Sequence, residues 1–203
     1  SFCMCPGGFI VPAATAEGEV VVNGMSPSRR NNKFANSGIV VEINIDKDIP
    51  KYDQFGPLKG LEYQKNLERL AFTSGARNQT APAQRLVDFV EGKLSPTLNE
   101  TSYQPGLNSA PMHSLLPKLI GSGLRKGFEA FGRKMHGYYT NEANIVGVES
   151  RTSSPLNIPR KDNLEHPEIE GLFPCGEGGG YAGGIVSAAM DGERCAEAAI
   201  ELL

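Results

Sequence analysis

The chain has 203 residues, of which 39% are hydrophobic and 21% charged, values typical of a soluble globular protein with one domain or about one and a half. A net charge of -3 argues against a nucleic-acid or membrane-surface partner, and no run approaches the roughly 18 apolar residues that span a bilayer. A chain of this size with only four cysteines does not need disulfides, so we expect a reducing, cytoplasmic compartment.

The N-terminal part is predicted to be rich in strands. Residues 9–14 and 19–23 are β-prone runs, and the four-residue turn 15–18 between them predicts a hairpin. Residues 25–37 are polar and predict a loop. Residues 38–45 are mostly β-branched and predict a strand.

The middle of the chain is predicted to be mainly helical. Leucines at helical spacing predict a helix over 60–74. A second helix is predicted over 83–91, with Pro82 at its start and Gly92 just past its end. Residues 94–111 are rich in Ser, Pro, Asn and Thr and predict an irregular segment.

A longer helix is predicted over residues 115–135. Ser114 is the expected N-cap, and Pro117 falls in the first turn, where proline is tolerated. Residues 143–148 then predict a return to a strand.

The C-terminal part predicts a short strand, a glycine-rich loop and a helix. The strand is expected over 171–175, the loop over 176–184 and the helix over 185–203. A helix N-terminus exposes unpaired N–H groups and a partial positive charge, and glycines let that backbone approach a ligand closely. Glu177 in the loop is placed to accept hydrogen bonds from ribityl or ribose hydroxyls. A phosphate or cofactor site and a turn with only a packing role both remain open on this pattern.

Two familiar phosphate-binding motifs are absent from the chain. The loop is not the G-x-G-x-x-G fingerprint of a dinucleotide-binding strand–turn–helix. It is also not a P-loop, because no Gly-Lys-Ser/Thr follows it. The pattern Gly176-Glu177 with Gly183-Gly184 leading into a helix resembles instead the second flavin-binding motif near the C-terminus of many FAD-dependent oxidoreductases.

Further segments extend this resemblance over nearly the whole chain. In order, they resemble a family of FAD-dependent (NAD/FAD-utilising) dehydrogenases: Phe2-Cys3-Met4-Cys5-Pro6-Gly7-Gly8, Val22-Asn23-Gly24-Met25-Ser26, Ala35-Asn36-Ser37, Pro82-Ala83-Gln84-Arg85 and Glu149-Ser150-Arg151-Thr152-Ser153-Ser154-Pro155. Such proteins begin with a G-x-G-x-x-G segment, which this chain lacks. We therefore expect a C-terminal fragment, and the abrupt start at Ser1 also indicates a piece of something longer.

The resemblance implies an FAD site and names its residues. The acidic residue of the motif contacts the ribityl or pyrophosphate part of FAD, and the helix N-terminus faces the pyrimidine side of the ring, where negative charge builds on reduction. The predicted cofactor-binding residues are Gly176, Glu177, Gly178, Gly179, Gly180, Gly183, Gly184, Ile185, Asn36 and Ser153.

The catalytic residue is not identified, and three side chains are candidates. Cys3 and Cys5 form a Cys-x-Cys pair that fits a redox or flavin-facing role, although buried cysteines are often simply small hydrophobes. Arg151 is expected to lie where the chain re-enters the cofactor domain, with a donor for a flavin edge or a substrate carboxylate. No metal site is expected, because no His or Cys has partners at metal-ligand spacing.

The predicted fold class is α+β, a fragment of a two-domain FAD-dependent oxidoreductase with a mixed sheet and a mainly helical middle. Residues 1 to about 45 and about 140 to 160 are expected to supply the sheet. Residues 1–160 would form a substrate or cap domain with its helical middle at 46–139, and 161–203 would complete the FAD domain. The expected partners are the N-terminal FAD-binding half, a small-molecule substrate and NAD(P)H. Two alternatives stay open, namely a stand-alone anion- or phosphate-binding module and a structural interaction domain.

Overall fold

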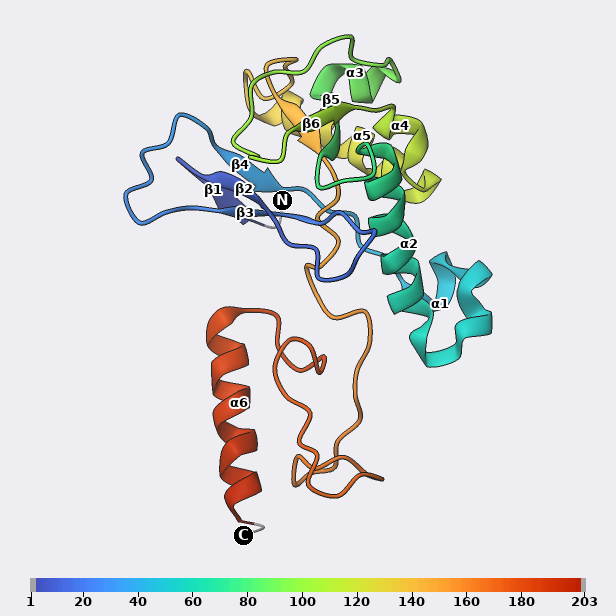
Figure 1. The fold of residues 1–203 in the computed structure, drawn as a ribbon, viewed down its shortest axis with the longest axis vertical. Helices are drawn as coiled ribbons and strands as arrows, with labels where there is room; N and C mark the ends of the chain where they lie inside the picture. Colours follow the sequence, from blue (N-terminus) through green and yellow to red (C-terminus); the bar gives the residue numbers. More distant parts are fainter. Residues whose placement is uncertain (1–2, 202–203) are drawn as a thin grey trace. The chain divides into compact units, whose positions relative to one another are not determined.

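A computed structural model describes residues 3–201 and divides the chain into two compact units (Figure 1). The first unit contains the chain up to Asp48 together with Lys65–Ser150. The second contains Ile49–Gln64 together with the chain from Arg151 onward. Helix α2, Lys59–Ser74, passes from one unit into the other and confirms the helix predicted over 60–74. The structure is α+β, as predicted.

The N-terminal strands of the first unit form two antiparallel pairs. Strand β1, Cys3–Cys5, pairs with β4, Asn36–Gly38. Strand β2, Phe9–Pro12, pairs with β3, Val22–Met25, in a register that places Phe9 opposite Met25. The predicted hairpin is therefore present. Its four-residue connection is wrong, because the chain between the strands runs from 13 to 21 and buries Val20 and Val21 before β3 begins.

The strand predicted over 38–45 is also wrong. The pairing of β4 ends at Gly38, residues 39–44 form neither helix nor strand, and helix α1 follows at Ile45–Asp48. Ile39 and Val41 nevertheless pack against the core. β-Branched residues favour a half-buried position, but a strand forms only where a neighbouring strand accepts and donates its backbone hydrogen bonds.

The mixed sheet comes from the middle of the chain. Strand β5, Ala81–Arg85, is central, with β6, Leu107–Ser109, parallel on one side and β7, Asn144–Val146, antiparallel on the other. The expected strand over 143–148 is present as β7. The expectation that residues 1–45 join this sheet is wrong, since their strands form separate two-stranded sheets.

The helix predicted over 83–91 begins three residues later than expected. Residues 81–85 are β5, and only Leu86–Glu91 form helix α3, which ends at Gly92 with a left-handed φ of 73°. Ala81 and Ala83 are completely buried, and both edges of β5 are paired. Tertiary pairing therefore overrides the local helix propensity of this segment.

The long helix predicted from residue 115 is divided at Pro117. A short helix α4, Met112–Leu115, is followed by α5, Lys118–Lys134, with Pro117 at the α5 N-cap. The residue before a proline is driven to extended backbone, and Leu116 has ψ 143°. Ser114 is consequently inside α4 and not a cap; its hydroxyl donates to the Pro111 carbonyl at 3.0 Å.

Helices α3, α4 and α5 gather around β5 and enclose the main core (Figure 1). The Phe89 and Phe128 rings meet edge to face, with centroids 6.0 Å apart. Each such buried side chain contributes on the order of 2 kcal/mol through removal of apolar area from water. The buried cluster consists of Leu86, Phe89, Val90, Met112, Leu124 and Phe128.

A buried polar contact joins β5 to α4. Gln84 is fully buried, its amide nitrogen donates to the Lys93 carbonyl at 2.6 Å, and its amide oxygen accepts from the His113 backbone at 3.2 Å. The Gln84 amide nitrogen also lies 2.8 Å from His113 Nδ1. Burial, and then the nearby Arg125 guanidinium, lower the pKa of His113 below its ordinary value.

We expect this histidine to make the first unit sensitive to acid. A lowered pKa in the folded state means that the neutral ring stabilises the fold above the unfolded value near 6.5, and that this stability is lost as the pH falls below it. The urea midpoint, followed by circular dichroism, should therefore decrease from pH 7.5 to pH 5.5. His113→Gln should flatten this dependence, whereas substitution of the exposed His136 by Gln should leave it intact; the reverse pattern would contradict the assignment.

The second unit is dominated by one long helix. Helix α6, Ile185–Ile200, confirms the predicted helix, whose expected end at Leu203 lies outside the described residues. The short 3-10 segment η1, Pro50–Leu58, precedes α2. The strand predicted over 171–175 is wrong, because this stretch has no strand partner. The His166 N–H donates to the Leu172 carbonyl at 2.7 Å, and Arg160 donates to the Pro174 carbonyl at 2.9 Å.

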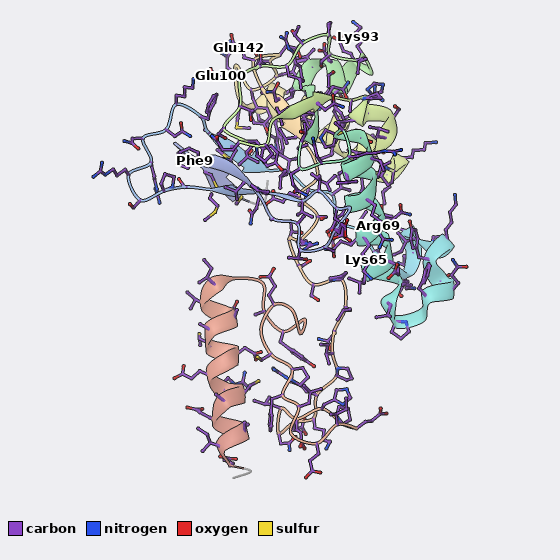
Figure 2. All side chains as sticks on the ribbon, in the orientation of Figure 1. Phe9, Lys65, Arg69, Lys93, Glu100 and Glu142 are labelled. Carbon is purple, nitrogen blue, oxygen red and sulfur yellow. The ribbon has the colours of Figure 1, made fainter. Side chains whose placement is uncertain are left out.

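Charged side chains lie on the outside of the first unit. Figure 2 shows Lys93, Glu100 and Glu142 pointing outward from the loops around the mixed sheet, and all three are exposed. Phe9 on β2 is 40% exposed and leaves an apolar side chain on the N-terminal strands (Figure 2). Within residues 3–201, no helix combines the length and apolar character needed to cross a bilayer.

Candidate flavin-contacting loop and thiol cluster

The glycine-rich loop, residues 176–184, is held along one side by residues 154–158. The backbone N–H of Ile158 donates to the Gly179 carbonyl at 3.1 Å, and the Asn157 amide donates to the Gly180 carbonyl at 3.2 Å. Tyr181, which is part of the loop, adds a third contact with this segment, because its hydroxyl donates to the Ile158 carbonyl at 2.8 Å. The Gly179 and Gly180 carbonyls therefore have partners in this unit.

An ion pair anchors the start and the middle of the loop to α6. The Arg160 guanidinium contacts the two Asp191 carboxylate oxygens at 3.0 and 2.8 Å, and these side chains are only 10% and 7% exposed. Asp191 also accepts the Gly176 N–H at 2.9 Å. Arg160 lies over the Tyr181 ring at 3.6 Å from its centroid. The first and sixth residues of the loop are thus tied to one side-chain pair.

The environment of Asp191 strongly favours its charged form. Hydrogen bonds from Arg160 and then from the Gly176 N–H lower the pKa of Asp191 to about 2. The same carboxylate raises the pKa of Arg160. Both groups remain charged at neutral pH, which suits a bidentate, partly desolvated pair.

The glycines of the loop fall into two classes. Gly176 and Gly180 have φ of 67° and 85°, which other residues adopt only with strain, and a Cβ at Gly180 would lie 2.7 Å from the Leu156 carbonyl. Gly178 and Gly183 are different, because a Cβ at either position would meet no atom within 4 Å. Backbone conformation therefore explains the first class, with close packing in addition at Gly180, whereas the second class leaves backbone open to an approaching group.

The N-terminus of α6 continues this open side of the loop. Gly184 is the N-cap in extended conformation, and no side chain caps the helix there. Ile185 and Val186 in the first turn are 92% and 71% exposed. Glu177 is exposed as well. Uncapped N–H groups next to open glycines form a surface that suits an anionic or electron-rich ligand.

A second cluster in the first unit brings three predicted residues together. The β1–β4 pairing places Cys5 opposite Asn36, and Cys3 and Cys5 share one face of β1, where a hydrogen bond joins their thiols. A Cβ at Gly24 would collide with the Asn36 amide oxygen and lie 3.5 Å from the Cys5 sulfur. Arg151 and Ser153 belong to the other unit, and their grouping with this cluster stays a prediction.

The thiol cluster favours protonated sulfur. Burial, then Cys3 and then the negative charge of Glu149 raise the pKa of Cys5. Burial also raises the pKa of the half-buried Glu149. Thiolate is the nucleophilic form of cysteine, so this environment does not by itself activate Cys5 at neutral pH. Among residues 3–201, the structure contains no group of three or more His, Cys, Asp or Glu placed to hold a metal ion.

Arg160 and Asp191 were not anticipated from the sequence. One signal was available for Asp191, which stands four residues before Cys195 on α6 and so shares its buried face. Arg160 follows Pro159 in a polar stretch and carries no comparable signal. Its importance depends on contacts with residues 14 to 35 positions away.

Comparison with known proteins gives the family. Residues 1–152 match the family described as "FAD-dependent protein, C-terminal domain-like". The match ends within two residues of Ser150, where the first unit ends. An uncharacterized protein from Clostridium beijerinckii is 41% identical over 203 residues, covering 99% of this chain. The chain spans 37% of the length of that relative. By this match, the chain belongs to the family of FAD-dependent protein C-terminal domains.

Proposed function

We propose that this chain forms the C-terminal part of an FAD-dependent oxidoreductase, with the glycine-rich loop and the α6 N-terminus as its contribution to the flavin site. The family match over residues 1–152 supports the association with FAD, and the role of the loop, which lies outside that match, is proposed from its own geometry. The loop geometry agrees with it, because the open glycines and the uncapped helix end fit an electron-rich ring or a phosphate.

Each part of the loop has a distinct role in this proposal. Backbone N–H groups of residues 183–186 and the positive end of α6 bind the cofactor where negative charge is greatest. Glu177 accepts hydrogen bonds from its hydroxyls. Arg160 and Asp191 touch no cofactor and act as positioning residues that fix the loop. The bound FAD would carry the hydride chemistry.

The substrate site is proposed to involve the thiol cluster. Cys3, Cys5 and Asn36 lie together in the first unit, and Arg151 and Ser153 of the second unit are proposed separately as flavin- or substrate-contacting residues. We propose a small organic molecule as substrate and NAD(P)H as electron donor or acceptor. The nucleotide-binding half is proposed to lie in another part of the protein and to cover the apolar side chains Ile185, Val186 and Met190 of α6.

Visible spectroscopy of the full-length protein tests the proposal. The purified protein should be yellow, release FAD on denaturation and lose its visible absorbance when reduced anaerobically by NADH or NADPH. A colourless protein that takes up no added FAD would overturn the flavin assignment. Binding of inorganic phosphate without any binding of flavin would point instead to an anion-binding module.

A further inference from the structure

A second pair of thiols lies at the base of the glycine-rich loop. Cys175 is exposed, and Cys195 on α6 is only 3% exposed. Burial raises the pKa of the Cys195 thiol, and the neighbouring Cys175 thiol adds to this rise, so the two side chains lie near each other. The Cys195 sulfur also lies 3.8 Å from the carbonyl oxygen of Pro174, the residue directly before Cys175. The Cys195 sulfur therefore lies against the backbone next to Cys175, although 20 residues of sequence separate the two cysteines.

The surroundings of this pair suit a reaction between the two sulfurs. Arg160 donates to the Cys195 sulfur at 3.3 Å and to the Pro174 carbonyl at 2.9 Å, so one guanidinium holds both sides of the pair. Burial raises the pKa of the Cys195 thiol, and the positive charge of Arg160 opposes this rise and stabilises the negative charge that develops on the sulfur during attack. Cys175 is open to a small oxidant, whereas Cys195 is buried.

We propose that Cys175 and Cys195 are a peroxide-sensitive thiol pair that forms a disulfide between the start of the glycine-rich loop and α6. In the first step the Cys175 sulfur attacks hydrogen peroxide, the O–O bond breaks, and water leaves after proton uptake, giving a sulfenic acid. In the second step the Cys195 sulfur attacks the Cys175 sulfur, the S–O bond breaks and a second water leaves. The balance is two thiols and one peroxide to one disulfide and two waters. A dithiol reductant reverses it.

The disulfide would act on the loop that we assign to flavin. Cys175 lies between the Pro174 carbonyl held by Arg160 and the Gly176 N–H held by Asp191. A covalent link at this point fixes the start of the loop to the helix that follows it. This consequence rests on the proposed function, and we expect bound FAD to leave the oxidised protein more slowly than the reduced one. Formation of the link itself needs no flavin.

Thiol mapping of the full-length protein tests the link directly. The protein is treated with hydrogen peroxide, free thiols are alkylated, and the peptides are examined by mass spectrometry without reduction. We expect a peptide joining Cys175 to Cys195 that is lighter by two hydrogen atoms and disappears after dithiothreitol. Cys175→Ser and Cys195→Ser should each abolish it, whereas the matched double variant Cys3→Ser/Cys5→Ser should retain it.

Three outcomes would overturn the inference. They are alkylation of both thiols after peroxide, oxidation of Cys175 to sulfinic acid while Cys195 stays alkylatable, and a disulfide between Cys175 residues of two chains. The map of the unsubstituted protein decides between these outcomes even if a serine variant fails to fold. Running the map on protein stripped of flavin as well separates this result from the flavin assignment, because the cross-link should form in both forms.

Discussion

Substitution of Asp191 by Ala should release the glycine-rich loop and abolish stable flavin binding. It removes the partner of a buried guanidinium and the acceptor of the Gly176 N–H in one step. Leaving one member of a buried ion pair unpaired costs about 3 kcal/mol or more. Arg160→Ala should have a similar effect, because it leaves the buried Asp191 carboxylate without the guanidinium that pairs with it. The measurements are flavin retention on gel filtration and the urea midpoint of unfolding.

A graded series of variants separates geometry from charge at this pair. Arg160→Lys keeps the positive charge but cannot make the two-pronged contact, so its flavin retention should lie between wild type and Arg160→Ala. Glu193→Ala changes an exposed acidic residue two positions from Asp191 on the same helix, and it should behave as wild type. If Asp191→Ala and Glu193→Ala bind flavin equally well, the pair does not position the loop.

The same pair predicts how the second unit responds to acid. The pKa of Asp191 is lowered from its ordinary value of 3.8 to about 2. A lowered carboxylate pKa stabilises the fold above the unfolded value, and this stability is lost as the pH falls from about 4 toward 2. The wild-type protein should lose more stability over this window than Asp191→Asn, which has no proton to gain.

Substitution of Gly183 by Val should weaken flavin binding while leaving the fold intact. The position is open, with no atom within 4 Å of a Cβ, and its φ lies outside the left-handed region. Because the Cβ has open space among the described residues, we expect the side chain to act mainly on a group that approaches the loop. We expect the FAD dissociation constant to rise at least tenfold, equivalent to about 1.4 kcal/mol.

The controls for Gly183 use the other glycines of the same unit. Gly192→Ala on α6 also fills open space but lies outside the loop, so the affinity for FAD should not change. Gly180→Ala should destabilise the protein itself, because its Cβ would lie 2.7 Å from the Leu156 carbonyl at a φ of 85°. If the Gly183→Val variant is folded and binds FAD as tightly as wild type, the glycine-rich loop is not part of the flavin site.

Local sequence patterns determined several elements of this protein correctly. The leucine spacing in 60–74 and the alanine-rich C-terminal segment gave α2 and α6, since a helix satisfies its own backbone hydrogen bonds within the segment. The glycine at position 92 correctly predicted where α3 ends, and the structure shows it in the left-handed conformation. The β-prone runs gave the β2–β3 pair, which lies close in sequence. The glycine-rich loop could likewise be recognised as an unusual segment.

Only the tertiary structure decided which residues hold that loop and which strands share a sheet. The 39–44 segment has the β-branched residues typical of a strand and the β5 segment does not, but β5 has two strand partners and 39–44 has none. Arg160, Asp191, Cys175 and Cys195 meet although up to 35 residues separate them. A strand or an ion pair depends on a partner far along the chain, and such a partner leaves no trace in the residues next to it.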